Sequence, residues 1–457
     1  MHEEVMRMNA REPIPVNVPF CLEWEGPLDT DLLNIAVSSL VRRHAAFRTA
    51  LTPNPDVRST EREISLRVFA SCRLITPRLY HQMVIEEVDQ PPIPVVNVKE
   101  LTHLEAAVQE LVRGDVNQSF DYARPPLLRG RLLRTTAQRH LLILVAPMLI
   151  CDLWSMRVLH LELARLYDEA SNPALPRSAA PVSQFHQFVS WQYEYAYAGR
   201  FNSDIAFWRQ QWENCELSQV WRRNFPFSKT GSTSGCAGTE RFQLTPERSR
   251  RIRAYADNAQ VDVRSVVLAC FAGWLGGVTN KSRVALNIAC RNRSPEYVGT
   301  IGWFSNQHLI GLDIPPESPG VEIALQAHAT LAAAEKHQAV PPAVLWRDLG
   351  RMPEQGDTRV FFTFIPAIGS PPVLTQEGII VRPRPMPELH GLRSPAGLSF
   401  AAIDQEEGLS LSANYSLDQF RSEDMHRMMT EIGGMLCSVV DHPESPLLRL
   451  RAARLHD

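Results

Sequence analysis

An interval rich in proline separates two halves of this chain, and both halves carry strand and helix patterns. The interval, residues 171–183 (SNPALPRSAAPVS), contains three prolines and few apolar residues, a composition typical of a linker between folded lobes. A chain of 457 residues also exceeds what one hydrophobic core usually serves. The length leaves two large lobes or three small domains open. Two lobes divided at this interval would span residues 1–172 and 173–457.

Each half mixes patterns of both secondary-structure types. In the first half, residues 132–146 include the apolar run LLILVA, which predicts a buried strand, and a helix with an apolar stripe follows from Asp152 and Ser155. In the second half, residues 409–415 alternate strictly between apolar and polar side chains, which predicts a half-buried strand. The predicted fold class is therefore α+β, with two lobes of comparable build.

Composition and charge exclude several classes of function. The 47 basic and 50 acidic residues give a formal net charge of −3, so the whole chain has no electrostatic footprint for nucleic acid or an anionic membrane. No stretch approaches the roughly 18 apolar residues of a membrane span, and the first residues lack the apolar core of a signal peptide. The eight cysteines form no C-x-x-C pair and no metal-ligand spacing with histidine.

These features predict a cytoplasmic monomer that binds no nucleic acid, no membrane, no metal and no cofactor of its own. Two short basic runs, at residues 222–225 and 448–457, could touch an acidic partner protein, but solvated surface is the simpler interpretation.

The most specific pattern lies between residues 120 and 169. Phe120 and Asp121 precede a Pro-Leu-Leu-Arg segment at residues 126–129, a buried strand follows, and the next helix opens with Asp152, Trp154 and Ser155. This block resembles the centre of the condensation domains of nonribosomal peptide synthetases, in the superfamily shared with chloramphenicol acetyltransferase. Further blocks resemble the same family in the same order, at residues 26–29, 42–51, 183–192, 206–212, 290–307 and 359–364.

The resemblance covers nearly the whole chain, from about Val16 to Pro446. It implies two chloramphenicol-acetyltransferase-like lobes forming a V with a central tunnel. In that family the tunnel admits the phosphopantetheine arms of two carrier proteins, so the expected partners are acyl or peptidyl carrier proteins of a synthetase.

The chain departs from the family pattern where the family has its two histidines. Counting back from Asp152, these positions are Pro147 and Met148, and the family glycine is Leu153. A thioether has no proton to take or give at neutral pH, so general-base catalysis from Met148 is impossible. Peptide condensation by the usual histidine mechanism is therefore not expected.

The heterocyclisation branch of the family matches the segment better. That branch carries Asp-x-x-x-x-Asp-x-x-Ser, and Asp152 and Ser155 match its second aspartate and its serine, whereas Pro147 replaces its first aspartate. The resemblance places the branch's functional threonine on Thr363 and its partner aspartate near Ser399, where no carboxylate stands. Descent from this branch is therefore better supported than its reaction.

The resemblance also gives Asp152 a structural role, in a buried ion pair with an arginine from the second lobe. Arg291 is the first candidate for this partner and Arg293 is the alternative. Losing one member of such a pair strands the other charge, at a cost of about 3–5 kcal/mol, so both are expected to be present.

Several side chains near the motif have a functional and a structural interpretation. The candidate catalytic residues are Thr363, Asp152, Ser155 and His308. His308 could act as an acid or base, but a histidine hydrogen-bonded at a strand edge is the simpler interpretation. Cys151 could be a nucleophile, yet its place in an apolar run is typical of an inert buried thiol.

Two functions remain in competition. The first is a free-standing domain that works in trans on carrier-bound acyl or peptidyl thioesters, promoting condensation or cyclisation by positioning the reactants instead of by a histidine base. The second is an inactive domain that docks carrier proteins or recruits a tailoring enzyme. A coenzyme-A-dependent acyltransferase of the same superfamily is a third possibility, and the missing histidine argues equally against it.

Overall fold

The computed structural model describes residues 17–53, 80–98, 104–177, 183–213, 237–349, 360–366, 373–375, 378–384, 397–405 and 408–450. The chain folds into two compact units, and each unit collects segments that are far apart in the sequence. The first unit contains residues 1–198, 291–305 and 370–389. The second contains residues 199–290, 306–369 and 390–457.

The first unit is built on a six-stranded sheet with the strand order β11-β12-β1-β6-β5-β4. Its strands are β1 (Asn17–Glu25), β4 (Val95–Asn97), β5 (Arg129–Arg134), β6 (Arg139–Pro147), β11 (Val373–Leu374) and β12 (Ile380–Pro383). A separate two-stranded sheet pairs β2 (Thr49–Pro53) with β3 (Tyr80–Val84). Strand β6 contains the apolar run LLILVA and is buried from His140 onward, so the predicted buried strand is confirmed.

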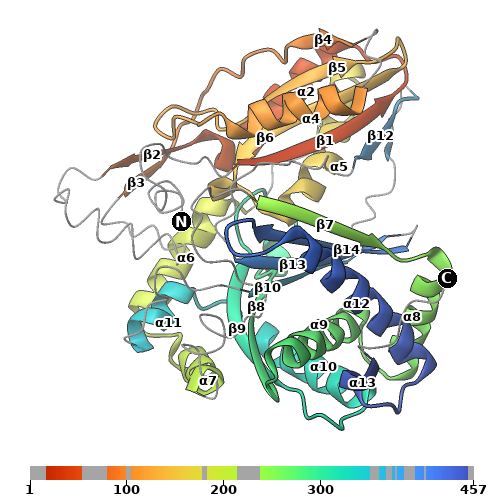
Figure 1. Cartoon of the computed structure of the whole chain (residues 1–457). Helices are drawn as coiled ribbons and strands as arrows, with labels where there is room; N and C mark the ends of the chain where they lie inside the picture. The colour runs from red at the N-terminus through yellow and green to blue at the C-terminus, as the bar shows by residue number, and fades with distance from the viewer. Residues whose placement is uncertain are drawn as a thin grey trace. The chain divides into compact units, whose positions relative to one another are not determined.

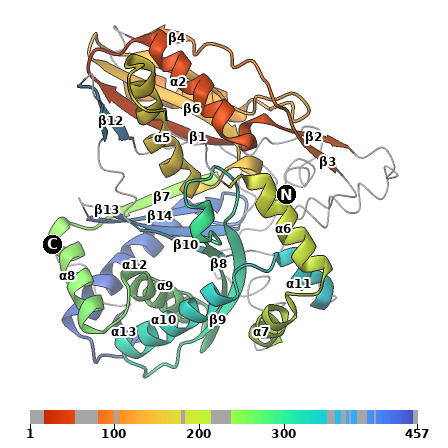
Figure 2. The same ribbon diagram turned by 180° about the vertical axis from the view of Figure 1, so that it is seen from behind.

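Helices cover both faces of this sheet. Helices α2 (Thr30–Arg43) and α5 (Leu153–Ser171) pack together on one face, and α4 (Leu104–Asn117) lies on the other, as the two opposite views show (Figures 1 and 2). Alternate residues of a strand point to opposite faces, and Leu142 and Leu144 join the core shared with α2 and α5. This two-sided cover explains why β6 is apolar at nearly every position.

Segments from the second half of the sequence complete the first unit. Strand β12 pairs with β1 on one side and with the edge strand β11 on the other, and the carbonyl oxygen of Val381 lies 3.2 Å from Nε2 of the buried His160. Helix α6 (Phe185–Tyr197) also belongs here, because the Gln184 amide donates to the Arg43 carbonyl at 3.1 Å and accepts from the Ala45 backbone at 2.9 Å.

The observed units therefore differ from the predicted division at residues 172 and 173. The contacts of α6 carry the first unit to residue 198, past the proline-rich interval. Residues 178–182 of that interval, like the basic run at residues 222–225 and most of the run at 448–457, lie outside the described residues.

The second unit has its own six-stranded sheet, with the order β7-β14-β13-β10-β8-β9. Its strands are β7 (Ala237–Gln243), β8 (Arg283–Cys290), β9 (Asn306–Asp313), β10 (Val360–Ile365), β13 (Leu398–Gln405) and β14 (Gly408–Ser416). In β14 the apolar residues Leu409, Leu411, Ala413 and Tyr415 are buried, so the alternating strand is confirmed.

The helices of the second unit gather on one face of its sheet (Figures 1 and 2). They include α8 (Pro246–Asn258), α9 (Val263–Thr279), α10 (Gly320–Lys336), α12 (Ser422–Asp441) and α13 (Leu447–Leu450). Phe271 of α9 stacks on Phe400 of β13 with the ring centroids 4.4 Å apart, which fixes that face as the apolar one. Two further helices of this unit are α7 (Asn202–Glu213) and α11 (Pro342–Leu349).

Among the described helices, none is long and apolar enough on its own to cross a membrane. Helices α8 and α9 reach the length and apolar composition of a membrane span only when they are taken together, and the chain bends by 101° between them.

The close approach of β5 and β6 gives a test of the first sheet. A Cβ added to Gly130 would lie 2.5 Å from both the Ile143 carbonyl oxygen and a methyl group of Leu144, on the neighbouring strand. We expect Gly130→Ala to lower the free energy of unfolding by about 1–3 kcal/mol, because the central strand cannot move away. The measurement is urea unfolding at pH 7.

Gly114 in α4 is the matched control, because nothing lies within 4 Å of an added Cβ there. Gly114→Ala should raise the free energy of unfolding by about 0.5–1 kcal/mol, the usual gain in a helix interior. Equal effects of the two substitutions would contradict the register of β5 and β6.

Candidate functional site

The motif segment, which we define as residues 147–155, links the central strand of the first sheet to helix α5. Strand β6 ends at Pro147, one turn of 3₁₀ helix spans Met148–Ile150, and α5 begins at Leu153. Pro147 has φ −66°, which suits its ring, and it pairs with Asn17 of β1. Strand β6 thus delivers the segment from the sheet directly to the start of the helix.

Asp152 is the residue that caps α5. Its carboxylate accepts hydrogen bonds from the backbone N–H of Ser155 at 3.0 Å and from the Ser155 hydroxyl at 2.9 Å. The two residues form a capping box, with Asp152 at the N-cap and Ser155 at the third helical position. The structure therefore places both predicted residues at the helix start, with the aspartate in the capping position.

The buried ion pair predicted for Asp152 is present, but its partner is Arg293. The guanidinium Nη2 lies 2.9 Å from Asp152 Oδ1, and the two side chains are 0% and 3% exposed. The first candidate, Arg291, is wrong, since it is exposed and its guanidinium lies 4.7 Å from the ring centre of Trp154. Arg293 also belongs to the first unit by its contacts, although it stands in the second half of the sequence.

The backbone at Asn292 shows why the wrong arginine was the first candidate. In an extended chain, residues 291 and 293 would project to the same side, and sequence alone would not separate them. Asn292 has φ 47°, in the left-handed region, and its side chain donates to the Phe304 carbonyl oxygen at 3.1 Å. This turn breaks the alternation and sends only Arg293 inward.

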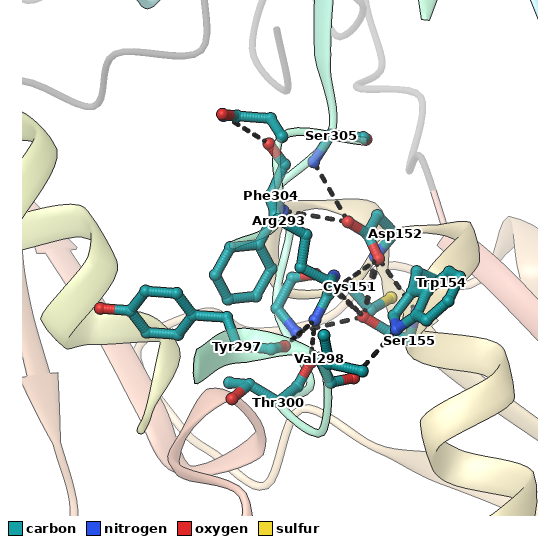
Figure 3. A network of polar contacts seen from close by, with 12 residues as sticks. Cys151, Asp152, Trp154, Ser155, Arg293, Tyr297, Val298, Thr300, Phe304 and Ser305 are labelled. Atoms are coloured by element: carbon teal, nitrogen blue, oxygen red, sulfur yellow. Dashed lines mark hydrogen bonds and ion pairs between the residues drawn. The ribbon is translucent and has the colours of Figure 1, made fainter. Parts of the chain in front are cut away.

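Two backbone donors complete the surroundings of Asp152 (Figure 3). The N–H groups of Phe304 and Ser305 lie 3.0 and 3.1 Å from Oδ2. With Arg293 and the two groups of Ser155, the carboxylate accepts five hydrogen bonds. Sequence reasoning missed the two amides, because every residue type except proline supplies a backbone N–H.

Arg293 donates to carbonyl oxygens as well, although its Nε has no hydrogen-bond partner among the described residues. Its guanidinium donates to the carbonyl oxygens of Tyr297, at 2.7 Å, and Thr300, and it lies 4.0 Å from the ring centre of Phe304. Burial lowers the pKa of Arg293, and the charge of Asp152 opposes that shift. Residues 293–305 are thereby held against the start of α5.

These contacts give Asp152 and Ser155 a structural role. A carboxylate offers about four lone-pair sites, and five donors already surround this one. The Ser155 hydroxyl is engaged as well, at 2.9 Å from the Gly302 carbonyl oxygen and 3.1 Å from the Gly302 N–H. Neither group is placed to exchange a proton with a substrate.

Cys151 matches the inert interpretation. It is fully buried, and its thiol donates to the Pro147 carbonyl oxygen at 3.3 Å. Burial, with a smaller contribution from the charge of Asp152, raises the pKa of the thiol well above its ordinary value. The thiolate that a nucleophile requires is therefore disfavoured.

The other two candidate catalytic residues, Thr363 and His308, lie in the second unit. His308 is buried in the edge strand β9, stacks on Trp208 with the ring centroids 4.1 Å apart, and has Nε2 3.1 Å from the Gln338 carbonyl oxygen. These contacts match the structural interpretation of a histidine hydrogen-bonded at a strand edge.

Thr363 is half-buried in β10 and pairs with Ala401 of β13. The register aligns Phe362 with Ile288, and Ile288 with His308, so Thr363 projects from the opposite face of the sheet to His308. The structure therefore does not bring these two candidates together. Ser399, where the partner aspartate was sought, pairs with Phe361.

A second, largely buried polar cluster lies at the C-terminal end of α2, where Arg43 is the last residue. Glu162 of α5 accepts from Arg43 at 2.8 Å, lies 3.3 Å from Nε2 of His44, and pairs with Arg165 at 2.5 Å. Burial alone would raise the pKa of Glu162, but the hydrogen bonds from His44 and Arg43 and the nearby positive charges lower it to about 2. Within the described residues, no group of three or more His, Cys, Asp or Glu side chains could hold a metal ion.

Comparison with known protein families and sequences matches this chain to condensation domains and to peptide synthetases. A family model described as "Condensation domain" matches residues 77–453. The chain is 25% identical over 448 residues to the enniatin synthetase of Fusarium oxysporum, and 24% identical over 455 residues to surfactin synthase subunit 2 of Bacillus subtilis (strain 168). These alignments cover 94% and 98% of this chain but only 13% and 11% of the relatives.

Solved structures share the fold over nearly the whole chain. The condensation domain of a monacolin K polyketide synthase matches with a TM-score of 0.79 at 17% identity, covering 98% of this chain and 97% of that one. The X-domain from teicoplanin biosynthesis matches with a TM-score of 0.76 at 18% identity, covering 97% and 94%. A further structure is a complex of that X-domain with OxyB. These likenesses confirm the predicted α+β fold of two chloramphenicol-acetyltransferase-like lobes.

The corrected ion pair can be tested by a pair of substitutions. Arg293→Met should lower the free energy of unfolding by about 3–5 kcal/mol, because it leaves the buried carboxylate of Asp152 without its counter-charge. Arg291→Met removes the same charge from an exposed position and should cost less than about 1 kcal/mol. Urea unfolding of both variants decides between them, and a larger loss for Arg291→Met would contradict the assignment.

The depressed pKa of Glu162 predicts a stability that depends on pH. A carboxylate whose pKa falls from 4.5 to about 2 on folding stabilises the fold above pH 4.5 and loses that effect as the pH falls toward 2. Glu162→Gln should therefore lower the free energy of unfolding by about 2–3 kcal/mol at pH 7. The difference in this free energy between the variant and wild type should be about half as large at pH 3.

Urea unfolding at pH 7, 5 and 3 measures this gap. Glu110→Gln is the control, since Glu110 pairs with Arg113 on the exposed surface of α4 and should contribute less than about 0.5 kcal/mol at each pH. A gap for Glu162→Gln that does not change with pH would show that its contribution is not ionic.

Proposed function

Because this chain belongs to the condensation-domain family of nonribosomal peptide synthesis, we propose that it binds thioesters on carrier proteins without supplying a proton-transfer group of its own. In this role it docks an acyl or peptidyl carrier protein, or recruits a tailoring enzyme to one. The observation that carries the proposal is the chemistry of the motif segment, residues 147–155.

No side chain at a possible catalytic position of that segment is available for proton transfer or nucleophilic attack. Pro147 and Met148 have no ionisable side chain. Burial raises the pKa of the Cys151 thiol well above its ordinary value, and the Asp152 carboxylate is surrounded by five donors. The Ser155 hydroxyl is bonded within the same network.

The fold is compatible with a docking role. The X-domain from teicoplanin biosynthesis, which matches this chain with a TM-score of 0.76, has a structure in complex with OxyB. That complex supports the idea that a domain of this fold can bind a second protein.

A second candidate function is catalysis in trans by positioning alone. The intact network of Asp152 and Arg293 favours it, because a domain under no constraint beyond docking has less need of an ordered motif segment. An amine nucleophile that is already neutral needs little help from a base, and orientation can lower a barrier by about 7–11 kcal/mol at the ideal limit. A heterocyclisation-like reaction would rely on Thr363, whose side chain is half-buried on the face of β10 opposite Phe362.

Intact-protein mass spectrometry with an acyl-loaded carrier protein and an amine acceptor separates the two functions. We expect the wild-type chain to bind the loaded carrier and to give no product above the uncatalysed rate. Product that forms with wild type and disappears in Thr363→Ala would establish the second function. A chain that binds no carrier protein, loaded or unloaded, would contradict both.

Met148→His provides the companion test, since it restores an ionisable group at the position of the second family histidine. A general base contributes about 10²–10⁴-fold to a rate, so new product in this variant would show that the remainder of the site is competent. Circular dichroism checks that the variant folds.

A further inference from the structure

His160 is a buried histidine on the face of α5 that packs against the first sheet. The residue is 1% exposed, and its Nε2 lies 3.2 Å from the carbonyl oxygen of Val381 in β12. A neutral imidazole that carries its proton on Nε2 donates this hydrogen bond and keeps an acceptor lone pair on Nδ1. Among the described residues, Nδ1 has no hydrogen-bond partner. The surroundings therefore suit the neutral ring and provide no acceptor for a second ring proton.

Two further buried rings on this face of the sheet have nitrogens without partners. Trp24 of β1 pairs in register with Val381 on one side and with His140 of β6 on the other, so these side chains project from one face. That face carries α5, since the ring centroids of Trp24 and Tyr167 lie 5.3 Å apart. Within the described part of the chain, the indole Nε1 of Trp24 and Nδ1 of His140 are buried without hydrogen-bond partners. A proton on His160 would add a charge to a region whose polar atoms are already unsatisfied, which is costly.

Among the described residues, no carboxylate is placed to neutralise a protonated His160 by an ion pair. The charged residues on the elements packed around it are Arg134 of β5, Arg139 of β6, Glu23 and Glu25 of β1, Arg382 of β12, and Asp29, Asp31, Arg42 and Arg43 at the ends of α2. Arg134 pairs in register with His140 and adds positive charge, whereas Glu25 pairs with Arg382 at 2.9 Å. Burial lowers the pKa of His160, and the hydrogen bond to the Val381 carbonyl oxygen opposes that shift only in part.

Strand β12 is a short strand near the edge of the first sheet (Figure 1). It has four residues and pairs with β1, while the two-residue β11 forms the outer edge. Residues 370–389 belong to the first unit, although the residues before and after them belong to the second. Short edge elements open locally at a lower free energy than a central strand such as β6. Opening of β12 would therefore leave the centre of the sheet intact and would bring Nε2 of His160 into contact with water.

We propose that β11 and β12 form an acid-sensitive strap, which leaves the edge of β1 when His160 takes up a proton. In the open form the ring is in water and its pKa is near the ordinary value of 6.5, whereas burial in the closed form disfavours the proton. The closed form is therefore stabilised above that ordinary value, and the stabilisation is lost as the pH falls below it. Release detaches residues 370–389, through which the second half of the sequence joins the first unit. This switch is independent of the motif segment and of its proposed function.

Hydrogen exchange of the β12 amides at pH 7.5 and 5.5, corrected for the intrinsic rate at each pH, tests the strap. Mass spectrometry of peptides that cover residues 379–384 and 141–146 compares β12 with the central strand β6. We expect the protection of β12 to fall about five- to tenfold between the two pH values, because the open form gains a proton over this range. Its protection should also stay below that of β6 at both pH values. Protection of β12 that does not change with pH, or that equals the protection of β6, would overturn the proposal.

His160→Gln assigns the effect to this side chain, since an amide can still donate to the Val381 carbonyl oxygen but does not titrate. The protection of β12 in this variant should change by less than about twofold between the two pH values. A change as large as that of wild type would show that another group controls the strand, which contradicts the proposal.

His140→Gln is the matched control. His140 is 2% exposed on the same face of the sheet and, among the described residues, has no hydrogen bond to β12. This variant should keep the wild-type change in β12 protection, and loss of the change here but not in His160→Gln would assign the effect to the wrong histidine for the proposal. Circular dichroism checks that both variants fold. The comparison of β12 with β6 in the wild-type chain needs no variant, so it decides the matter even if one of them does not fold.

Discussion

The buried carboxylate of Asp152 is the interaction on which the motif segment depends. It receives donors from the first turn of α5, from Arg293, and from the backbone of Phe304 and Ser305. A charge this far from water is tolerated only when it is paired and hydrogen-bonded, so each of these segments must be in place together. The same contacts that satisfy the charge hold residues 293–305 against the start of the helix.

In the motif segment, the residues that hold the backbone in place are different from the residues at the family's catalytic positions. Asp152 and Ser155 stabilise the geometry through contacts that already occupy the carboxylate and the hydroxyl, and Arg293 supplies the counter-charge. Pro147 ends the strand and Met148 begins the next turn, and neither side chain has an ionisable group; the family resemblance would place the two histidines at these positions. A domain can therefore keep the ordered segment and its binding surface while the histidine chemistry is absent.

Local pattern was a sound guide wherever one face or both faces of an element are buried. The run LLILVA predicted β6, and the strict alternation at residues 409–415 predicted β14, because burial dictates apolar spacing directly. The ion pair of Asp152 was also foreseen from the family resemblance. The choice between Arg291 and Arg293 was not, since it depends on a left-handed turn at Asn292 that no side-chain pattern reveals.

The boundary between the two units could not be predicted by dividing the sequence at one position, because each unit contains segments that are far apart in the sequence. The chain passes from one unit to the other five times, after residues 198, 290, 305, 369 and 389. A chain divided at residue 172 would leave the first part without Arg293 to neutralise Asp152, and without β12 to cover the edge of β1. The proline-rich interval therefore marks a change of composition, whereas the unit boundary is set by the buried charge and the sheet edge that later segments return to satisfy.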